Sequence, residues 1–584
     1  MNLCKLAPAS FKKWVVISTF SLILLTVISY IFSPARFLLL LNVQINNVQR
    51  FDGVVHNTLL LFFALLAILF INQYISNGLR QKVNDTLNLF LNSLSRALSF
   101  NSLLIISSIY LFVLFVIGIK NYDIGTDEVW YILGGRSLFK FFFPYYTTNG
   151  LIYSGSNFYL ADNLTSLPTH IASFLNYAFN FTEVWQFKFT ATLLSCITII
   201  TVFYTIYKIY DIKYSTLFLF LVIIQPGFGF MATSFFGEIP QLFFFFAAVY
   251  FWFKEDKEFP DKKEILLISL FFALLGHTKL QTFPILILSL ILFHFIDKGK
   301  KPVQVAITTI ALFIFIAIIR TIPIFLFDQS LLIKIAKFYF LSFTAIGNES
   351  IVRLQRLQLY NHYLSILFFA LTLSISFFLI RKPIEKFIYL FTLIYTLWFI
   401  LFFDLNTYRN IFLGIFLIMF LASVSLLKAK DIYFSNLKST NNLRKFVIAF
   451  FVILLMIWGF SANLIYAIIG YNDGVQFDLE GSKTRLFTII RCDDSQKTFY
   501  KKIKNYISPN DTVYICGSGI PVFTTQFYLP DNPIYDFNHF KESLVIENRK
   551  LIIIDRVSYP IDLEVGRKVL DSLNLNKTLI LKTG

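Results

Sequence analysis

The chain has 584 residues, of which 57% are hydrophobic, 18% are aromatic and only 15% are charged, and its mean hydropathy is +0.68. A soluble globular domain carries about 25% charged residues, so this composition excludes an ordinary soluble enzyme. The formal net charge is +17. The Lys and Arg residues stand between long apolar runs rather than on a polar domain, which argues against a nucleic-acid partner and indicates membrane topology.

Thirteen apolar runs approach the roughly 20 residues that a helix needs to cross a bilayer. We therefore expect an α-helical polytopic membrane protein with about 13 transmembrane helices. The expected spans are 14–34, 55–73, 102–119, 185–208, 214–230, 239–254, 264–278, 281–296, 303–326, 362–380, 387–403, 410–427 and 446–469.

The first of these runs follows Lys5, Lys12 and Lys13. Its apolar part is about 20 residues long, whereas the apolar region of a secretory signal peptide has about 7–15 residues, and no obvious small-residue cleavage site accompanies it. We predict that this run is retained as the first span.

The distribution of positive charge predicts the orientation. With a cytoplasmic N-terminus, the inside segments carry about twice as many Lys and Arg residues as the outside segments before residue 470, although the inside segments are shorter. Thirteen spans then place the C-terminus outside the cytoplasm.

From about residue 470 the chain is balanced in charge and contains no run long enough to span a membrane. Short β-rich segments alternate with turn signals and polar helical stretches, which is typical of a small α/β domain. The β-rich segments are 512–516, 533–537, 551–555 and 578–581. The expected domains are a two-span extension (1–101), a transmembrane module (102–469) with an outer loop (120–184), and a soluble α/β domain (470–584).

The cysteines are Cys4, Cys196, Cys492 and Cys516, and their spacing matches no metal site. Cys492 and Cys516 both lie in the C-terminal segment, where a disulfide and two free thiols are both compatible with an oxidising compartment.

Two adjacent carboxylates, Asp127 and Glu128, follow the third expected span. Crowding of like charges raises the pKa of one member of such a pair, which suits a group that accepts a proton near neutral pH. The pair is also able to share a divalent cation. Alternatively, the motif is a helix start, with Thr126 or Asp127 as the N-cap and Glu128 in the first turn.

Two further motifs place charged residues between apolar runs on the same side. Glu238 precedes Pro240 and either caps a helix or faces the acidic pair. Lys279, two residues after His277, has no acidic neighbour in sequence. Binding of an anion such as phosphate and snorkelling to the outer headgroups are both open for this lysine.

Three arginines share this predicted side. Arg353 and Arg356 stand three residues apart in an outer loop, on one face if the segment is helical, whereas a plain solvated loop is the alternative. Arg409 stands where the eleventh and twelfth expected spans meet, and arginine is suited to bidentate phosphate contacts.

In order and sidedness, these features resemble the GT-C class of polytopic glycosyltransferases. Within that class they are most similar to bacterial members of the protein mannosyltransferase-like and lipid A sugar-transferase-like type. The likeness extends through roughly 100–430. It rests on T-D-E-V-W-Y (126–131), L-P-T-H (167–170), E-V-W-Q-F-K-F-T (183–190), S-F-F-G-E-I-P (234–240), G-H-T-K-L-Q-T-F-P (276–284) and T-Y-R-N-I-F-L (407–413).

The resemblance implies transfer of a sugar from a polyprenyl-phosphate donor, with inversion, on the periplasmic face of a bacterial inner membrane. The acceptor would be a glycan, a lipid or a protein. The resemblance specifies no cofactor, and a divalent metal is compatible with the acidic pair. The implied roles are catalytic for Asp127 (the base) and Glu128, donor-phosphate binding for Lys279, Arg409 and His277, and substrate or cavity contacts for Glu238, Arg353, Arg356 and Tyr131.

Two other classes of function compete with this hypothesis. A transporter or flippase of lipid-linked glycans predicts charges buried in the middle of spans and internal repeats, whereas most ionisable residues here gather at one surface. A non-catalytic scaffold that displays the C-terminal segment leaves Lys279 and the acidic pair without a role.

Overall fold

The computed structural model of the chain describes most of residues 99–435 and the strands of the C-terminal segment. The described ranges are 99–121, 126–141, 147–148, 151–152, 167–181, 183–223, 226–235, 237–254, 260–327, 366–402, 408–435, 512–516, 534–536, 551–556 and 578–583, with a few single residues besides. The expected spans 14–34, 55–73 and 446–469 lie outside these ranges, as do Cys4 and Cys492.

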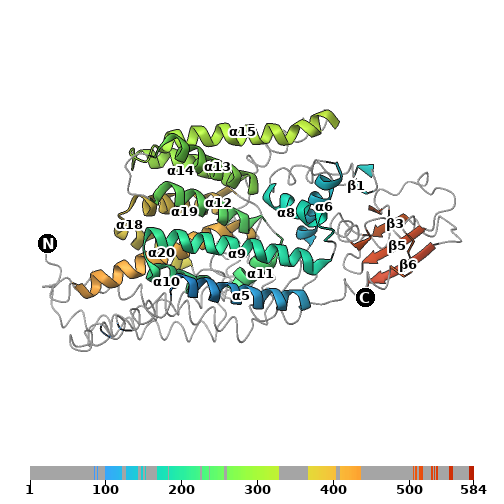
Figure 1. Cartoon of the computed structure of the whole chain (residues 1–584), viewed down its shortest axis with the longest axis horizontal. Helices are drawn as coiled ribbons and strands as arrows, with labels where there is room; N and C mark the ends of the chain where they lie inside the picture. Colours follow the sequence, from blue (N-terminus) through green and yellow to red (C-terminus); the bar gives the residue numbers. More distant parts are fainter. Residues whose placement is uncertain are drawn as a thin grey trace, which may run out of the picture.

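Long helices run back and forth along the long axis of the molecule and form a bundle (Figure 1). The helices are α5 (Phe100–Asn121), α6 (Thr126–Phe141), α8 (Leu167–Ala178), α9 (Val184–Ile209), α10 (Ile212–Ile223), α11 (Pro226–Thr233), α12 (Glu238–Phe253), α13 (Lys262–Thr278), α14 (Thr282–His294), α15 (Pro302–Phe327), α18 (Ile366–Leu379), α19 (Pro383–Phe402) and α20 (Tyr408–Ser435).

Three described helices are long and apolar enough to cross a membrane: Val184–Ile209 in α9, Pro302–Ile322 in α15 and Ile411–Lys428 in α20. Further apolar helices, among them α12 and α14, are shorter. The chain is an integral membrane protein, and the total of 13 spans stays a prediction.

Helices α20 and α15 occupy contrasting positions in the bundle. The apolar stretch of α20 is 89% buried and packs on α10, α18, α19 and α12, whereas that of α15 is only 17% buried. In Figure 1, α15 forms one edge of the bundle. Its exposed Ile314, Phe315 and Ile318 form an apolar surface of the kind that faces lipid.

The expected span 214–230 is not one continuous helix. Two helices, α10 and α11, cover this run, and the second begins at Pro226. Proline has no backbone N–H and clashes with the preceding turn, so it is tolerated at the start of a helix but not in its middle. The apolar composition therefore predicted the run correctly but overlooked the break.

Local capping groups explain where the helices turn at one end of the bundle. Asp211 Oδ1 accepts the backbone N–H groups of Lys213 and Tyr214 and caps α10. Asp261 and Glu264 cap α13 reciprocally, because each side chain accepts the backbone N–H of the other residue. Such caps satisfy donors that the first turn of a helix leaves unpaired.

The alternating helix directions define two ends of the bundle. The site end carries the starts of α6, α9, α12, α14 and α20 and the end of α13. The opposite end carries the end of α9, the starts of α10 and α19, and the ends of α12, α14 and α18. The motifs 126–131, 234–240, 276–284 and 407–413 therefore all belong to the site end.

Four parallel strands form a sheet in the C-terminal segment. They are β3 (Thr512–Cys516), β4 (Ile534–Asp536), β5 (Leu551–Arg556) and β6 (Thr578–Thr583), in the order β4-β3-β5-β6. The β-rich segments predicted from sequence thus form strands, and in Figure 1 the sheet lies beyond the site end of the bundle. Parallel strands need crossover connections, and these lie outside the described residues, so the α/β domain itself remains a prediction.

Candidate functional site

The acidic motif begins helix α6. The helix starts at Thr126, so Asp127 and Glu128 lie in its first turn, where the helix dipole favours negative charge. The motif therefore lies at a helix start, as the alternative interpretation predicts, but the helix begins at Thr126, so neither Thr126 nor Asp127 is the N-cap that this interpretation named. The backbone of Asp127 is described, whereas its side chain lies outside the described part of the chain.

Glu128 is buried in an ion pair with Lys188 of α9. Lys188 Nζ lies 2.7 Å from both Glu128 carboxylate oxygens, and the side chains of Lys188 and Glu128 are 3% and 2% exposed respectively. Glu128 Oε1 also accepts the backbone N–H of Phe235 over 2.6 Å. One carboxylate thus joins α6, α9 and the turn between α11 and α12.

This contact explains an ionisable residue that the sequence placed inside a span. A charged side chain within a span is costly unless it is paired, and Lys188 is the partner that Glu128 needs. The apolar run around Lys188 was a signal of such a role, although the identity of its partner depends on tertiary packing.

Glu238 and Lys279 form a second ion pair at the site end, and it is looser. Lys279 Nζ lies 3.3 Å from Glu238 Oε1 and 5.9 Å from the ring centroid of Phe399 in α19. Glu238 is the first residue of α12 and lies in its first turn, but Gly237 is the N-cap, so the predicted capping role of Glu238 is wrong. Lys279 is the C-cap of α13, so the pair joins the start of one helix to the end of the next.

His277 is held by α15. Its Nε2 lies 3.1 Å from the carbonyl oxygen of Phe313, its Nδ1 lies 3.3 Å from Arg320 Nη1, and its ring stacks on that of Phe313. A carbonyl and a guanidinium fix the tautomer, because the first only accepts and the second only donates. Both ring nitrogens are therefore engaged within the protein, and Arg320 is a second in-span cation that has a partner.

Helix α8, which belongs to the predicted outer loop, lies against α6. It also packs on α9 and on α13. Its Ser173 hydroxyl donates to the carbonyl of Ile132, and a Cβ added at Gly135 would meet the Ser173 side chain and, at 2.7 Å, the backbone N of Phe174. The half-buried Tyr131 has its ring centroid 6.1 Å from that of His170.

The structure describes no side chain of the three arginines that the sequence analysis singled out. Arg409 is the second residue of α20, at the site end, but its side chain lies outside the described residues. Arg353 and Arg356 lie outside them altogether. Within the described residues, no group of three or more His, Cys, Asp or Glu side chains is arranged to hold a metal ion.

Two contacts thus link three separate motifs in series. Glu128 in the first motif bonds Phe235 in the second, and Glu238 in the second pairs with Lys279 in the third. The residues before α12 contact the acidic start of α6 through Phe235, and the first residue of α12 contacts the cationic end of α13 through Glu238. This set places carboxylates beside a cation at one end of a membrane bundle.

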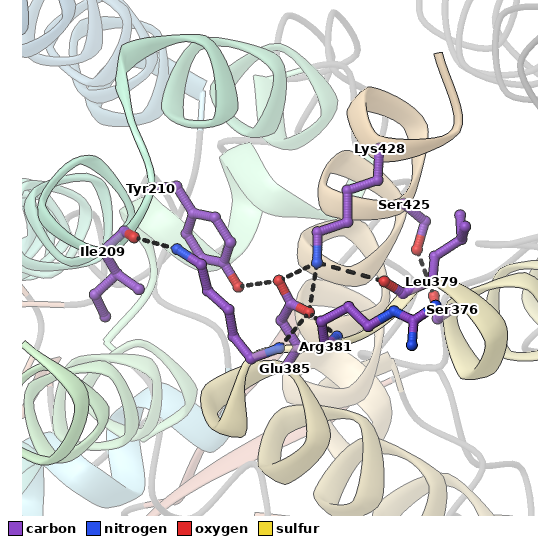
Figure 2. A network of polar contacts seen from close by, with 9 residues as sticks. Ile209, Tyr210, Ser376, Leu379, Arg381, Glu385, Ser425 and Lys428 are labelled. Carbon is purple, nitrogen blue, oxygen red and sulfur yellow. Dashed lines mark hydrogen bonds and ion pairs between the residues drawn. The ribbon is translucent and has the colours of Figure 1, made fainter. Parts of the chain in front are cut away.

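A third ion-paired cluster lies at the opposite end of the bundle, and sequence reasoning did not single it out. Glu385, in the first turn of α19, is fully buried and lies 2.5 and 2.6 Å from Lys428 Nζ of α20. It also accepts the hydroxyl of Tyr210 and the backbone N–H groups of Arg381 and Lys382. Figure 2 shows these contacts converging on one carboxylate.

Comparisons with known proteins identify a shared fold. No protein-family model matches the chain, and no curated protein sequence matches it. Among solved structures, the chain is similar to ArnT from Cupriavidus metallidurans bound to undecaprenyl phosphate. The TM-score is 0.51 at 14% identity, with 83% of this chain and 90% of that chain covered.

ArnT from the same organism in the apo state is also similar. Its TM-score is 0.47 at 12% identity, with 81% of this chain and 88% of that chain covered. The similarity to the lipid-bound structure shows that this chain has the fold of a GT-C glycosyltransferase, as the sequence resemblance predicts.

Proposed function

We propose that this protein is a membrane glycosyltransferase that moves a sugar from a polyprenyl-phosphate donor to an acceptor at the site end of the bundle. The main support for this proposal is a pair of contacts at the site end: Glu128 accepts the backbone N–H of Phe235, and Glu238 pairs with Lys279. It occurs in a fold shared with ArnT, whose structure was solved with undecaprenyl phosphate bound.

In the proposed reaction, Asp127 is the base. It takes the proton of the acceptor hydroxyl while that oxygen attacks the anomeric carbon of the sugar, and the bond from this carbon to the phosphate oxygen breaks. The electron pair leaves with polyprenyl phosphate, whose growing charge Lys279 and Arg409 stabilise. A single direct displacement inverts the anomeric carbon, and no acid is needed because the leaving group is an anion already bound by cations.

Glu128 and Lys188 act as a brace for the base. Because both Glu128 oxygens are occupied by Lys188 and one also by the N–H of Phe235, its carboxylate fits a positioning role better than proton transfer. The brace fixes the first turn of α6, and hence the position of Asp127, against α9 and the 234–238 turn.

The remaining predicted residues are assigned to the surroundings of this centre. Tyr131 and Glu238 belong to the substrate side, and His277 orients the end of α13 next to Lys279. Arg353 and Arg356 stay as proposed contacts of the outer loop.

The charge distribution supports a site end on the outer face of a bacterial inner membrane, with a cytoplasmic N-terminus. The acceptor is then a glycan, a lipid or a protein of the cell envelope. A reporter that is active only in the cytoplasm should stay inactive when fused after Gly584, and an active fusion would overturn this orientation.

The direct test uses purified full-length protein and lipid-linked sugars extracted from cells with and without it. Asp127→Asn should lower the rate of sugar transfer by about 10²–10⁴, the usual contribution of a general base, without loss of folded protein. Asp211→Asn is the matched control, because asparagine caps a helix as well as aspartate does.

Normal transfer by Asp127→Asn would remove the base assignment. Movement of the intact lipid-linked sugar between leaflets, with no transfer, would instead identify the protein as a flippase.

A further inference from the structure

Two parallel contacts join the start of α12 to the turn between α13 and α14. Glu238 pairs with Lys279, and Gln241 Nε2 donates to Thr282 Oγ1 over 2.5 Å. Residues three apart are neighbours on a helix surface, so Glu238 and Gln241 share one face of α12. Each contact uses one of the two polar atoms at the end of the α12 side chain.

The second polar atom of each side chain, an oxygen, is buried and has no hydrogen-bond partner among the described residues. Glu238 Oε2 and Gln241 Oε1 have no hydrogen-bond partner within the part of the chain that the structure describes, and the two residues are 4% and 0% exposed. Native proteins rarely leave buried acceptors without a donor, because the lost hydrogen bond to water costs free energy. A ligand that brings hydrogen-bond donors would satisfy both oxygens.

We infer that these two oxygens bind hydroxyl groups of the donor's sugar, an inference that rests on the proposed function. A phosphate bound at Lys279 lies beside Glu238, because these two residues are in contact. The sugar is attached directly to that phosphate and so reaches the neighbouring face of α12. The phosphate itself is excluded from the two oxygens, since it offers acceptors and negative charge where hydrogen-bond donors are needed.

The subsite therefore separates the two parts of the donor by their chemistry. Lys279 takes the anionic phosphate, whereas Glu238 and Gln241 select a group rich in hydrogen-bond donors. Discrimination is expected to be strong, because a sugar that lacks the matching hydroxyl leaves a buried polar group unpaired.

The test compares two kinds of lipid on the purified full-length protein. One probe is decaprenyl phosphate, and the others are decaprenyl phosphates that carry a hexose or a pentose. Gln241→Met should weaken equilibrium binding of the best sugar-bearing lipid by about tenfold, the value of roughly one hydrogen bond, and leave binding of decaprenyl phosphate unchanged. Thr282→Val is the matched control, because it breaks the same contact but keeps the Gln241 oxygen.

Glu238→Gln should act in opposite directions on the two probes. It removes a negative charge beside Lys279, so decaprenyl phosphate should bind more tightly, while the sugar-bearing lipid should bind about tenfold more weakly. Gln241→Glu keeps acceptor oxygens and should retain selection for the sugar.

Equal effects of Gln241→Met and Glu238→Gln on both probes would assign the two residues to structure and overturn the subsite, as would no effect on either. A wild-type protein that binds none of these lipids would overturn the proposed function itself. A wild type that binds them all, with unchanged variants, overturns the subsite alone.

Discussion

Glu385 and Glu238 are buried carboxylates at opposite ends of one bundle, and they are paired in different ways. Every oxygen of Glu385 has donors, with Lys428 at 2.5 and 2.6 Å and further bonds from Tyr210 and two backbone N–H groups. Glu238 has a single cation at 3.3 Å and one oxygen without a partner among the described residues.

We use this difference in pairing to distinguish carboxylates with a structural role from Glu238, for which we propose a role in ligand binding. Saturated ionic clusters leave nothing for a ligand to bind and stabilise the packing of the helices around them. Burial, and then the neighbouring Glu385 carboxylate, hold the pKa of Tyr210 well above its usual value, so its hydroxyl stays protonated and donates to Glu385. Glu128 is saturated too, which places it with the structural carboxylates although it stands in the site.

The largest expected effect comes from breaking the Glu128–Lys188 pair. Lys188→Met leaves a buried carboxylate without its cation, which should destabilise the folded state by about 3–5 kcal/mol, measured as a lower thermal midpoint, and should abolish transfer. The double variant Glu128→Gln with Lys188→Met should recover stability but not transfer. Recovery of both would show that the brace has no part in positioning Asp127.

Removal of the cation at the opposite end tests whether the Glu385–Lys428 pair has only a structural role. Lys428→Met should cost up to about 3–5 kcal/mol by the same mechanism, reduced because Lys428 is partly exposed. The protein that remains folded should transfer sugar at the normal rate per molecule. A rate lowered tenfold at constant folded fraction would contradict a purely structural role.

A third variant tests whether α8 fixes the acidic start of α6. Gly135→Ala introduces a methyl group against Ser173 and the Phe174 backbone, and such overpacking typically costs about 1–3 kcal/mol. Transfer should fall together with the thermal midpoint. Ala172→Gly is the control, because Ala172 precedes Ser173 in α8 and its replacement by glycine lowers helix stability in general. An equal loss of transfer in this control would exclude a specific effect of the α6–α8 contact.

The smallest effect on stability is expected at the unsaturated end. Glu238→Gln breaks only a long, single contact, so its cost should be below about 1 kcal/mol, whereas transfer should fall at least tenfold. A thermal midpoint lowered as far as in Lys188→Met would place Glu238 with the saturated carboxylates and remove the contrast.

The features that could be predicted from the sequence are those that depend on local composition, namely the apolar helices and the helix start at the acidic motif. The expected runs around α9, α12–α15 and α18–α20 are helices, and the acidic motif starts one. Hydrophobic length and capping residues decide these features, so they can be read from neighbouring positions. Pro226 shows the limit, because an apolar average hides a residue that interrupts the helix.

The partners of the charged residues could not be predicted in the same way. Lys188 and Glu128 are 60 residues apart, and Lys428 and Glu385 are 43 apart. Their pairing follows from which helices pack together, and no local pattern specifies that. An isolated charge in an apolar run was still a useful signal, since it predicts that some partner exists.

The central position of α20 has a consequence for how the chain assembles during synthesis. Helix α20 comes late in the described bundle, yet it fills the centre and supplies Lys428 to Glu385. Chains are made from the N-terminus, so Glu385 is synthesised before Lys428. The core formed by the earlier helices is complete only when α20 has been added. A chain that stops before residue 428 would thus form an incomplete bundle in which Glu385 lacks the cation that neutralises it.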